Sequence, residues 1–412
     1  MALLVQKFGG TSVGDPERIR NVADHVARCR RRGDQVVLVV SAMGKETDDL
    51  LRLAREVSDT RPGREMDMLI TAGERKAIAL VCMAIADLGF EAESYTGSQA
   101  GFVTDTNHTD AKILEVRPDR IAASLAAGRV PVVAGAQGVS TAFDVTFLGR
   151  GGSDTTAVAL AKALNADVCE LYTDVSGVFT TDPRLVPEAR KMSHISFDEL
   201  LEMTATGCPK PAMRSVEYAR RHGVALHIRS AFTWETGTLV TEEEAASEEE
   251  EMEHAIVSAI THDLSEAKVT VGGVPDRPGV AAQLFRSLAD RNVNVDMIVQ
   301  NTSAQGVTDI SFTVPLEDLD TAVSVAADMQ SELGALTITG DPDIARVSVI
   351  GSGMKTNPGV AATMFETLAD AGINIDMIST SVIRTSCVVR QADAERAVGI
   401  LHAAYELDRG GY

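Results

Sequence analysis

The sequence predicts an α/β protein in which a largely parallel sheet is followed by a repeated module of strands and helices. Three observations lead to this prediction. Apolar runs of strand length alternate with runs of helical period as far as residue 240, which is typical of sheets covered by helices on both faces. An acidic stretch then interrupts the pattern, and the rest of the chain carries one βαββαβ pattern twice.

The N-terminal half is expected to alternate between strands and helices. Buried-strand runs such as 36–40 are wholly apolar, whereas the helical stretches space their apolar residues by three and four. The expected strands are 3–7, 35–41, 91–95, 130–134, 168–173 and 225–229, and the expected helices are 16–31, 47–57, 64–88, 118–127, 157–164, 197–204 and 212–221. Sites in such sheets lie outside the carboxyl ends of the strands, where this chain has Lys7, Ser41, Gly135 and Thr173.

The stretch 148–157, Leu-Gly-Arg-Gly-Gly-Ser-Asp-Thr-Thr-Ala, has the chemistry of an anion site. Its paired glycines let backbone amides approach an anion, and Ser153 or Asp154 can cap the helix that follows, whose N-terminus favours negative charge. Arg150 offers a planar fork for a carboxylate or a phosphate. Taken alone, the stretch is equally compatible with a glycine-rich helix cap that binds nothing.

Composition excludes several classes of partner. The chain has 412 residues, too many for one core, and its net charge of −21 argues against binding to nucleic acids or anionic membranes. It shows no apolar run of membrane length and no leader segment, so a cytoplasmic protein is expected. The five cysteines have no metal or redox spacing and are expected to be free thiols. The acidic residues concentrate in 242–253, which makes 241–254 the expected linker.

The C-terminal half contains an internal repeat. Residues 278–298, which begin Pro-Gly-Val-Ala-Ala and end Asn-Val-Asp-Met-Ile, match residues 358–378. Each copy is predicted to form a Pro-Gly turn, a helix and a strand, preceded by a strand at 267–274 or 346–350 and followed by one at 308–314 or 386–390.

Four motifs together resemble one family. They are Val5–Ser12 (VQKFGGTS), Ala72–Arg75 (AGER), the glycine-rich stretch 148–157, and Tyr172–Phe179 (YTDVSGVF) followed by Asp182-Pro183-Arg184. At these spacings they resemble the aspartokinases of the amino acid kinase family, and the C-terminal repeat resembles the pair of amino-acid-sensing ACT domains that such enzymes carry. A ferredoxin-like pair used only for dimerisation is the alternative for the repeat.

The resemblance implies an N-terminal amino acid kinase three-layer sandwich with a mainly parallel central sheet, followed by two ferredoxin-like (βαββαβ) ACT domains. One ACT unit is inserted into the other in the family, so 255–263 is expected to pair with the second unit across the first. The implied boundaries are 1–240 for the catalytic domain, 241–254 for the linker, 264–340 for ACT domain 1, and 255–263 plus 341–412 for ACT domain 2.

The implied reaction is ATP-dependent phosphorylation of the side-chain carboxylate of L-aspartate to 4-phospho-L-aspartate, with Mg2+, at the entry to lysine, threonine and methionine synthesis. A carboxylate is already ionised at neutral pH, so the work is positioning and charge neutralisation, and no general base is required. The resemblance assigns catalysis to Lys7 and Asp154. It assigns substrate binding to Ser41, Thr47, Glu74, Arg150 and Ser153, and nucleotide binding to Lys7, Gly9, Gly10, Thr173, Asp174, Phe179, Asp182, Arg184 and Lys210.

Feedback is expected through the ACT units, with lysine and/or threonine as effectors. The expected effector-binding residues are Asp276, Val293, Asn294, Gln300, Asn374, Ile375, Thr380 and Ser381. A homo-oligomer formed through the ACT domains is expected, and an α2β2 assembly with a regulatory subunit started internally at Met252 is an alternative.

Some positions depart from the family pattern. Lys210 stands one place later than the family's nucleotide lysine, between two prolines. Beside the expected aspartate site, Ala136 stands where the family often has a phenylalanine, and Phe147 stands where the family has a threonine. These departures leave two rival functions open: a specialised paralogue that phosphorylates another amino-acid carboxylate, and a weakly active amino-acid-binding regulatory partner. Alternative roles also stay open for Thr47, as a helix cap, and for Glu74, as a surface acid.

Overall fold

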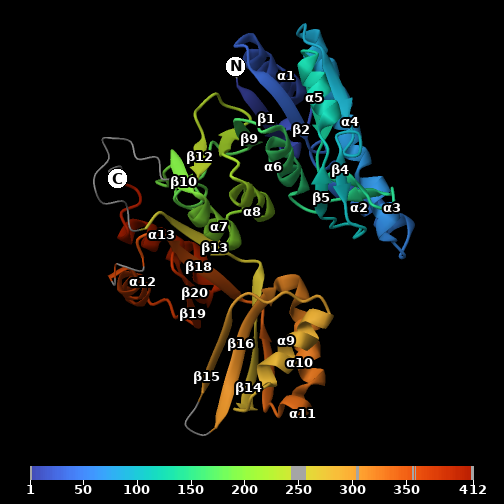
Figure 1. Ribbon diagram of the computed structural model, residues 1–412. Helices are drawn as coiled ribbons and strands as arrows, with labels where there is room; N and C mark the ends of the chain where they lie inside the picture. Colours follow the sequence, from blue (N-terminus) through green and yellow to red (C-terminus); the bar gives the residue numbers. More distant parts are fainter. Residues whose placement is uncertain (1, 243–256, 303–305, 355–356, 358, 410–412) are drawn as a thin grey trace. The chain divides into compact units, whose positions relative to one another are not determined.

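The computed structural model describes residues 2–242, 257–302, 306–354, 357 and 359–409, and these divide into two compact units (Figure 1). The N-terminal unit contains the described residues of Met1–Val178, Lys191–Thr204 and Pro209–Glu249. The C-terminal unit contains those of Phe179–Arg190, Ala205–Cys208 and Glu250–Tyr412. Most of the expected linker, together with the internal start at Met252, lies outside the described residues.

The N-terminal unit is built on an eight-stranded sheet in the order β10-β12-β11-β9-β1-β2-β6-β3. Neighbouring strands are parallel throughout, except where β11 and β12 meet. The strands are β1 (Leu3–Phe8), β2 (Gln35–Val40), β3 (Ala92–Tyr95), β6 (Val130–Ala134), β9 (Val168–Thr173), β10 (His194–Ser196), β11 (Leu226–Ser230) and β12 (Thr238–Thr241). The predicted mainly parallel sheet is therefore confirmed, and short β10 and β12 are additions to it.

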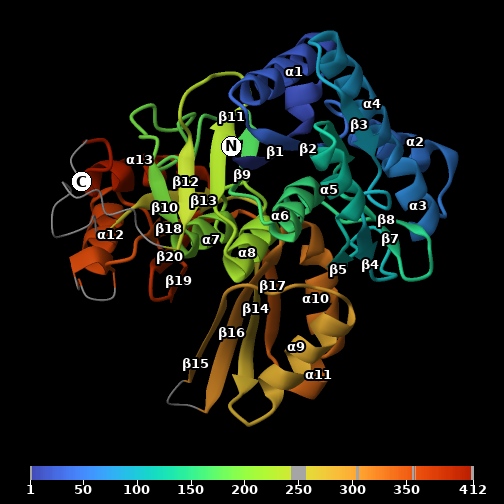
Figure 2. The ribbon, with the colours of Figure 1, turned by 45° about the horizontal axis from the view of Figure 1, so that its top comes forward.

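Helices cover both faces of this sheet. Alternate strand residues such as Leu4, Leu38 and Val132 share a core with α1 (Pro16–Arg31) and α4 (Ala72–Asp87). Side chains of the opposite phase, such as Val5 and Val39, are also buried, and α6 (Gly152–Leu164) contacts β1, β2 and β9. Since strand side chains alternate between faces, α6 covers the second face together with α8 (Met213–His222), as Figure 2 shows. The remaining helices of this unit are η1 (Gly10–Val13), α2 (Glu46–Val57), α3 (Gly63–Ile70), α5 (Asp119–Ala126) and α7 (Phe197–Ala205).

A second, four-stranded sheet in the order β5-β4-β7-β8 was not predicted from the sequence. Its strands have only three or four residues, too few for a period to be recognised. They are β4 (Phe102–Thr104), β5 (Ile113–Val116), β7 (Gln137–Ser140) and β8 (Val145–Phe147).

The single helix predicted over 64–88 is wrong, because the chain breaks into α3 and α4 at Thr71. The Thr71 hydroxyl donates to the Asp67 carbonyl at 2.7 Å, and Gln137 donates to the Thr71 carbonyl at 3.3 Å. Side-chain bonds of this kind compete with the helical ladder. The break therefore depends on a local bond and on a contact with a residue distant in sequence.

The C-terminal unit consists of two antiparallel sheets with helices, one for each sequence repeat. The first sheet has the order β15-β16-β14-β17 and the second has the order β13-β18-β20-β19. The strands are β13 (Ala259–Asp263), β14 (Glu266–Pro275), β15 (Ile298–Thr302), β16 (Val307–Pro315), β17 (Thr337–Asp341), β18 (Ile344–Ile350), β19 (Met377–Thr380) and β20 (Arg384–Arg390). Within the expected 255–263 segment, β13 pairs antiparallel with β18 of the second repeat.

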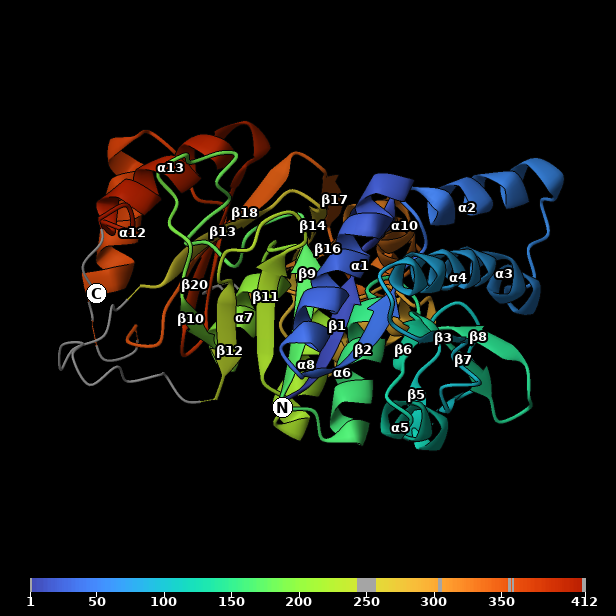
Figure 3. The ribbon, with the colours of Figure 1, turned by 90° about the horizontal axis from the view of Figure 1, so that it is seen from above.

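Each of these sheets is covered by its own helices. The first repeat packs α9 (Val280–Asp290), η2 (Leu316–Asp318), α10 (Leu319–Asp328) and α11 (Gln330–Leu333) around a core that includes Val271 and Phe312. The second packs α12 (Gly359–Asp370) beside α13 (Ala394–Ala404), which follows η3 (Gln391–Asp393) (Figure 3). The strand predicted to end each 21-residue repeat begins later than expected, at Ile298 and Met377.

The segment Phe179–Arg190 precedes residue 240 but packs with the C-terminal unit. Val186 is buried in the core of the second repeat. The Thr180 hydroxyl lies 2.9 Å from Nε2 of His402, and Arg190 donates to the Leu407 carbonyl at 2.8 Å. This part of the expected catalytic domain is therefore held by the second repeat.

Crossed ion pairs join the two repeats. Arg346 of β18 pairs with Asp296 of the first repeat, and Lys268 of β14 pairs with Asp376 of the second repeat at 2.8 Å. Lys268 and Arg346 stand at matching places in the two repeats, as do Asp296 and Asp376. Arg346 also approaches Glu266 (2.9 Å), and burial raises the pKa of that carboxyl even though the guanidinium opposes the rise. The ion pairs thus follow the internal symmetry.

We expect Arg346→Ala to lower the free energy of unfolding by about 3–5 kcal/mol, because it leaves the largely buried Glu266 carboxyl without its cation. The loss should be larger at pH 8 than at pH 5. A carboxyl with a raised folded-state pKa contributes stability below its unfolded pKa and loses it as the pH rises through the folded value. Urea unfolding measures both quantities. Arg390→Ala, at a half-exposed pair, is the control and should cost about 1 kcal/mol or less; equal losses in the two variants would contradict the prediction.

Candidate active site

Four parallel strands of the large sheet end side by side at one edge. The register pairs Phe8 at the end of β1 with Val40 of β2 and with Tyr172 of β9, and Val40 in turn pairs with Ala134 of β6. The predicted site positions Lys7, Ser41, Gly135 and Thr173 therefore lie on neighbouring strand ends.

An ion pair joins the two residues that the resemblance marks as catalytic. Nζ of Lys7 lies 2.5 Å from Oδ1 of Asp154, and their side chains are only 14% and 11% exposed. Asp154 also accepts a hydrogen bond from the backbone amide of Ala212 at 3.1 Å. One carboxylate thus connects β1, the first turn of α6 and the start of α8.

The predicted capping of α6 by Ser153 or Asp154 is wrong. The N-cap residue is Gly151 with φ of 72°, and no side chain caps the helix. Because Gly151 adopts the left-handed region, which costs glycine little, the helix begins one turn earlier than its apolar period indicates. Ser153 and Asp154 are consequently inside the first turn, where their side chains remain available for other contacts.

Two glycines allow the loops at this edge to approach closely. A Cβ on Gly10 would lie 2.7 Å from the Ala42 carbonyl oxygen, and the amide of Gly44 donates to the Gly10 carbonyl at 2.9 Å. A Cβ on Gly135 would lie 2.5 Å from the Ser153 hydroxyl oxygen. Any side chain at either position would push these loops apart, so glycine is required at both.

Glu74 is a buried carboxylate in the first turn of α4. It is 3% exposed, and burial raises the pKa of its carboxyl to about 7, with a smaller contribution from Glu46. Its Oε2 has no hydrogen-bond partner in the described part of the chain. The surface-acid alternative is therefore wrong, and an unpaired buried carboxylate is suited to a cationic ligand group.

Two other predicted substrate residues have different surroundings. Thr47 is the second residue of α2, whose N-cap is Lys45, so the alternative role of Thr47 as a cap is wrong. Arg150 is exposed, and its guanidinium makes no hydrogen bond or ion pair with any described residue. Nearby, Ala136 is buried with φ of 57° and donates to the Thr156 hydroxyl at 3.0 Å.

The predicted nucleotide residues are divided between the two units. In the N-terminal unit, Nζ of Lys210 lies 2.7 Å from Oδ1 of Asp174, which follows Thr173 at the end of β9. Partial burial opposes ionisation of Asp174, but Lys210 holds the pKa of that carboxyl below its usual range. The one-place shift of Lys210 therefore still brings its ammonium group to this edge.

Phe179, Asp182 and Arg184 belong to the C-terminal unit. Arg184 forks onto Asp182, with Nη2 2.6 Å from Oδ2, and this bond lowers the pKa of the Asp182 carboxyl.

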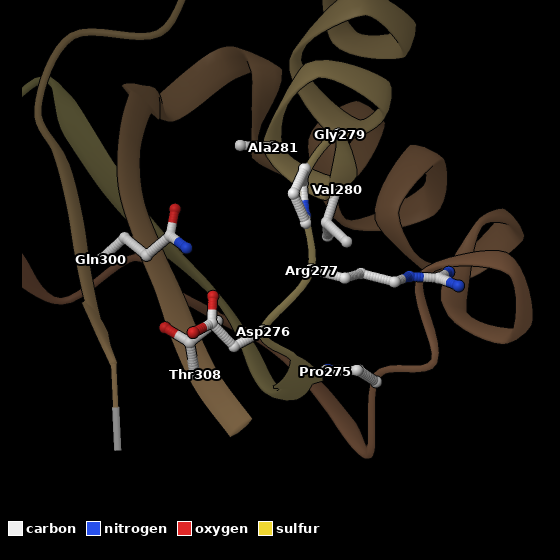
Figure 4. A pocket seen from close by; sticks show the side chains of 9 residues that line it. Pro275, Asp276, Arg277, Gly279, Val280, Ala281, Gln300 and Thr308 are labelled. Atoms are coloured by element: carbon white, nitrogen blue, oxygen red, sulfur yellow. The ribbon is translucent and has the colours of Figure 1, made fainter. Parts of the chain in front are cut away.

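A cavity of about 470 Å³ lies where β14 passes into α9 (Figure 4). Among the predicted effector residues, it brings together Asp276 and Gln300, beside Gly279, Ala281 and Thr308. Arg277 is also part of the lining, and its guanidinium donates to the Glu332 carbonyl at 2.8 Å. The other predicted effector residues do not line this cavity: Val293, Asn294, Asn374, Ile375, Thr380 and Ser381.

The described residues contain no group of three or more His, Cys, Asp or Glu side chains that could hold a metal ion. None of their helices combines the length and the apolar character needed to cross a membrane.

Comparison with known proteins gives the family. A model of the amino acid kinase family matches residues 2–230, and a model of the ACT domain matches residues 269–329 and 347–405. An aspartokinase of Mycolicibacterium smegmatis is 53% identical over 410 residues, which cover 99% of this chain and 97% of the relative. The chain belongs to the aspartokinases of the amino acid kinase family. The repeat is accordingly a pair of ACT domains, and the resemblance drawn from the motifs is confirmed.

Solved structures support the fold of this aspartokinase. The aspartate kinase of Synechocystis, at 45% identity, aligns with a TM-score of 0.55 over 98% of this chain and 70% of that one. Aspartokinase III of E. coli, solved with aspartate and ADP, gives a TM-score of 0.82 over 98% of this chain and 99% of that one. The latter is 23% identical and supports the fold alone.

Sequence reasoning missed several residues that shape the site. Glu46 lies near Glu74 and pairs with Lys76 at 2.6 Å. The Ala212 amide bonds to Asp154 across 58 positions, and Asp67 is wholly buried in α3. A backbone amide leaves no trace in sequence, and the two carboxylates belong to helices whose pattern indicates only surface acids. Nothing short of the tertiary structure could have assigned them.

Proposed function

We propose that this chain phosphorylates the side-chain carboxylate of L-aspartate with ATP, giving 4-phospho-L-aspartate. The observation that carries the proposal is the Lys7–Asp154 ion pair, held where the glycine turn after β1 meets the start of α6. Relatives that are about half identical over their full length are named aspartokinases, so neither rival function is favoured.

Lys7 is assigned to the transferring phosphoryl group. A Cβ on Gly9 would lie 3.5 Å from the Lys7 ammonium nitrogen, so the glycine turn lies directly beside that nitrogen. Amides of Gly9 and Gly10 and the N-terminus of α6 add partial positive charge at the same edge. Fixed positive charge of this kind stabilises the charge that develops during phosphoryl transfer.

Recognition of aspartate is assigned to groups of opposite charge. Glu74, with one unpartnered oxygen, is suited to the amino group, and the free guanidinium of Arg150 is suited to a carboxylate by a two-bond contact. Ser41, Thr47 and Ser153 complete the proposed substrate contacts.

ATP is assigned to the carboxyl end of β9. Thr173, Asp174 and Lys210 lie there in one unit, and Phe179, Asp182 and Arg184 complete the set by resemblance. Mg2+ needs only one or two protein carboxylates when the phosphates of ATP supply other oxygen ligands. The described residues around this site, which form no carboxylate cluster, are compatible with such binding. Asp154 would hold the ion through its water shell, and the ion would neutralise phosphate charge.

Regulation is assigned to the ACT domains, with lysine and/or threonine as effectors and with the predicted effector residues as their contacts. The cavity beside α9 supports an effector site there, because it combines a carboxylate and an amide with the backbone amides of a helix start. Pairing of ACT domains between chains gives a homo-oligomer, or an α2β2 assembly if an internally started subunit is made.

We expect Lys7→Ala to lower kcat by about 10²–10³, because it removes a preorganised cation from the phosphoryl group. ADP release in a coupled assay measures the rate, with aspartate and glutamate compared as substrates. Arg20→Ala, an exposed arginine on α1, is the control and should keep native activity. A Lys7→Ala enzyme as fast as the native one would overturn the catalytic assignment.

The raised pKa of Glu74 predicts that aspartate binds more tightly as the pH rises. Glu74 is mostly protonated at pH 6 and ionised at pH 8, and only the ionised form attracts an amino group. The KM for aspartate should therefore fall by about tenfold from pH 6 to pH 8, since a group with pKa of about 7 is roughly one-tenth ionised at pH 6.

Two controls accompany this measurement. Glu74→Gln should give a high KM that does not change with pH, and it should stabilise the free protein at pH 8, where the native carboxylate is ionised in a buried place with one oxygen unpartnered. A native KM that stays flat across this range would remove Glu74 from the amino-group site.

Asp276→Ala should weaken feedback inhibition about tenfold or more without changing the uninhibited rate, because a lost charged hydrogen bond is worth about 1.5–3 kcal/mol. Inhibition curves with lysine, with threonine and with both test this. Gln330→Ala is the matched control, since Gln330 lies in the same ACT domain and does not line the cavity. Identical curves for native and Asp276→Ala proteins would exclude the carboxylate from the effector site.

A further inference from the structure

A short loop lies against the turn that carries Arg150. This loop, residues 105–111, forms all but the last residue of the connection between β4 and β5. The amide of Ala111 donates to the Phe147 carbonyl at 2.9 Å, and a Cβ on Gly149 would lie 2.7 Å from Oδ1 of Asp110. The segment that leads into Arg150, residues 147–149, therefore packs along the 105–111 loop.

Arg214 of α8 ties the loop and the turn together. It donates to the carbonyls of Ala111 and Leu148, both at 2.8 Å, and it approaches Asp110 at 3.6 Å. Leu148 is wholly buried and also donates to the Ala136 carbonyl at 2.8 Å. A displacement of the loop would thus move the two residues that precede Arg150.

The backbone of the loop is strained at Thr109. This β-branched residue has φ of 70°, in the left-handed region that such residues rarely adopt. Strain of this kind persists only where surrounding contacts impose it, and it concentrates at functional sites. The loop therefore needs a group that holds Thr109 in place.

Asp67 provides that group. Its Oδ1 accepts from the Thr109 amide at 2.9 Å, and its Oδ2 lies 2.7 Å from Nδ1 of His108. The Asp67 side chain is fully buried, whereas that of His108 is 21% exposed. A buried carboxylate is costly unless it is hydrogen-bonded, and here both oxygens are used for one loop.

Asp67 also lies on a helix connected to Glu74. Its carbonyl accepts from the Thr71 hydroxyl at the break between α3 and α4, and Glu74 lies in the first turn of α4. The same helix pair therefore carries the proposed amino-group carboxylate and the carboxylate that holds the 105–111 loop.

We infer that Asp67, acting through Thr109 and His108, is a positioning residue that sets the place of Arg150 for the substrate carboxylate. This inference rests on the proposed function, because Arg150 is assigned there to carboxylate binding. Asp67 itself does not touch the substrate. Its effect should appear in the KM for aspartate and leave the KM for ATP and the kcat nearly unchanged.

The test compares Asp67→Ala with the native full-length chain in the coupled assay. We expect the KM for aspartate to rise about tenfold or more, because misplacing a positioning group by about 1 Å can cost on the order of 10²-fold. Asp67→Asn keeps an acceptor for the Thr109 amide and should remain close to native. Ile70→Val, a core truncation on the same helix, should lower the melting temperature and leave this KM unchanged.

A second substitution separates positioning from general stability. Glycine adopts φ of 70° without strain, so Thr109→Gly should hold the loop even without the Asp67 bonds. The Asp67→Ala/Thr109→Gly double variant should therefore recover most of the lost affinity for aspartate. If Asp67→Ala does not fold, His108→Ala replaces it, since this partly exposed ring supplies one of the two Asp67 contacts.

The outcomes distinguish this inference from the function on which it rests. Arg150→Ala should raise the KM for aspartate if Arg150 binds the carboxylate; an unchanged KM overturns that assignment and this inference with it. If Arg150→Ala raises the KM while Asp67→Ala only lowers the melting temperature, the proposed function stands and the inference is overturned. An Asp67→Ala enzyme whose KM is not restored by Thr109→Gly also overturns it.

Discussion

The ion pair between Lys7 and Asp154 is the contact on which the arrangement of the N-terminal unit depends. It joins the first strand of the sheet to α6, which begins 145 positions after Lys7. The same carboxylate accepts a hydrogen bond from the amide of Ala212. Two opposite charges with side chains 14% and 11% exposed must be paired to remain there. The pairing therefore fixes where the two glycine turns meet, and the proposed phosphoryl site follows from that meeting.

Glycines, and charged groups without an ion-pair partner among the described residues, surround the Lys7–Asp154 pair. Because Gly10 has no side chain, the Ala42 carbonyl can pack against its backbone, and the Ser153 hydroxyl packs against Gly135 in the same way. Glu74 stays buried with an unpartnered oxygen, and Arg150 stays free at an exposed turn. A buried carboxylate such as Glu74 costs stability in the free protein, and groups of this kind are common in binding sites. These two groups are the basis of the proposal that the site binds a ligand with both an amino group and a carboxylate.

In the C-terminal unit, the internal repeat extends beyond the backbone to the ion pairs between the two ACT domains. Arg346 with Asp296 and Lys268 with Asp376 are equivalent pairs exchanged between the two ACT domains. Duplication of one sequence accounts for their matching positions, and the contact between repeats accounts for their pairing. The short segment Phe179–Arg190 packs into the second repeat, so a stretch assigned by resemblance to ATP is held by a regulatory domain.

The sequence alone determined the features that depend on periodicity and on local chemistry. Alternating strand and helix periods predicted the parallel sheet, the repeat predicted two equivalent βαββαβ domains, and the spacing of the motifs predicted the family. The tertiary structure decided what depends on residues distant in the chain. Thr71 ends a helix that the apolar pattern continues, because its hydroxyl bonds to Asp67 and its carbonyl to Gln137. Strands of three or four residues form only because neighbouring strands supply their hydrogen bonds. The roles of Asp67 and the Ala212 amide likewise arise from contacts across the fold, and no local pattern records a contact of that kind.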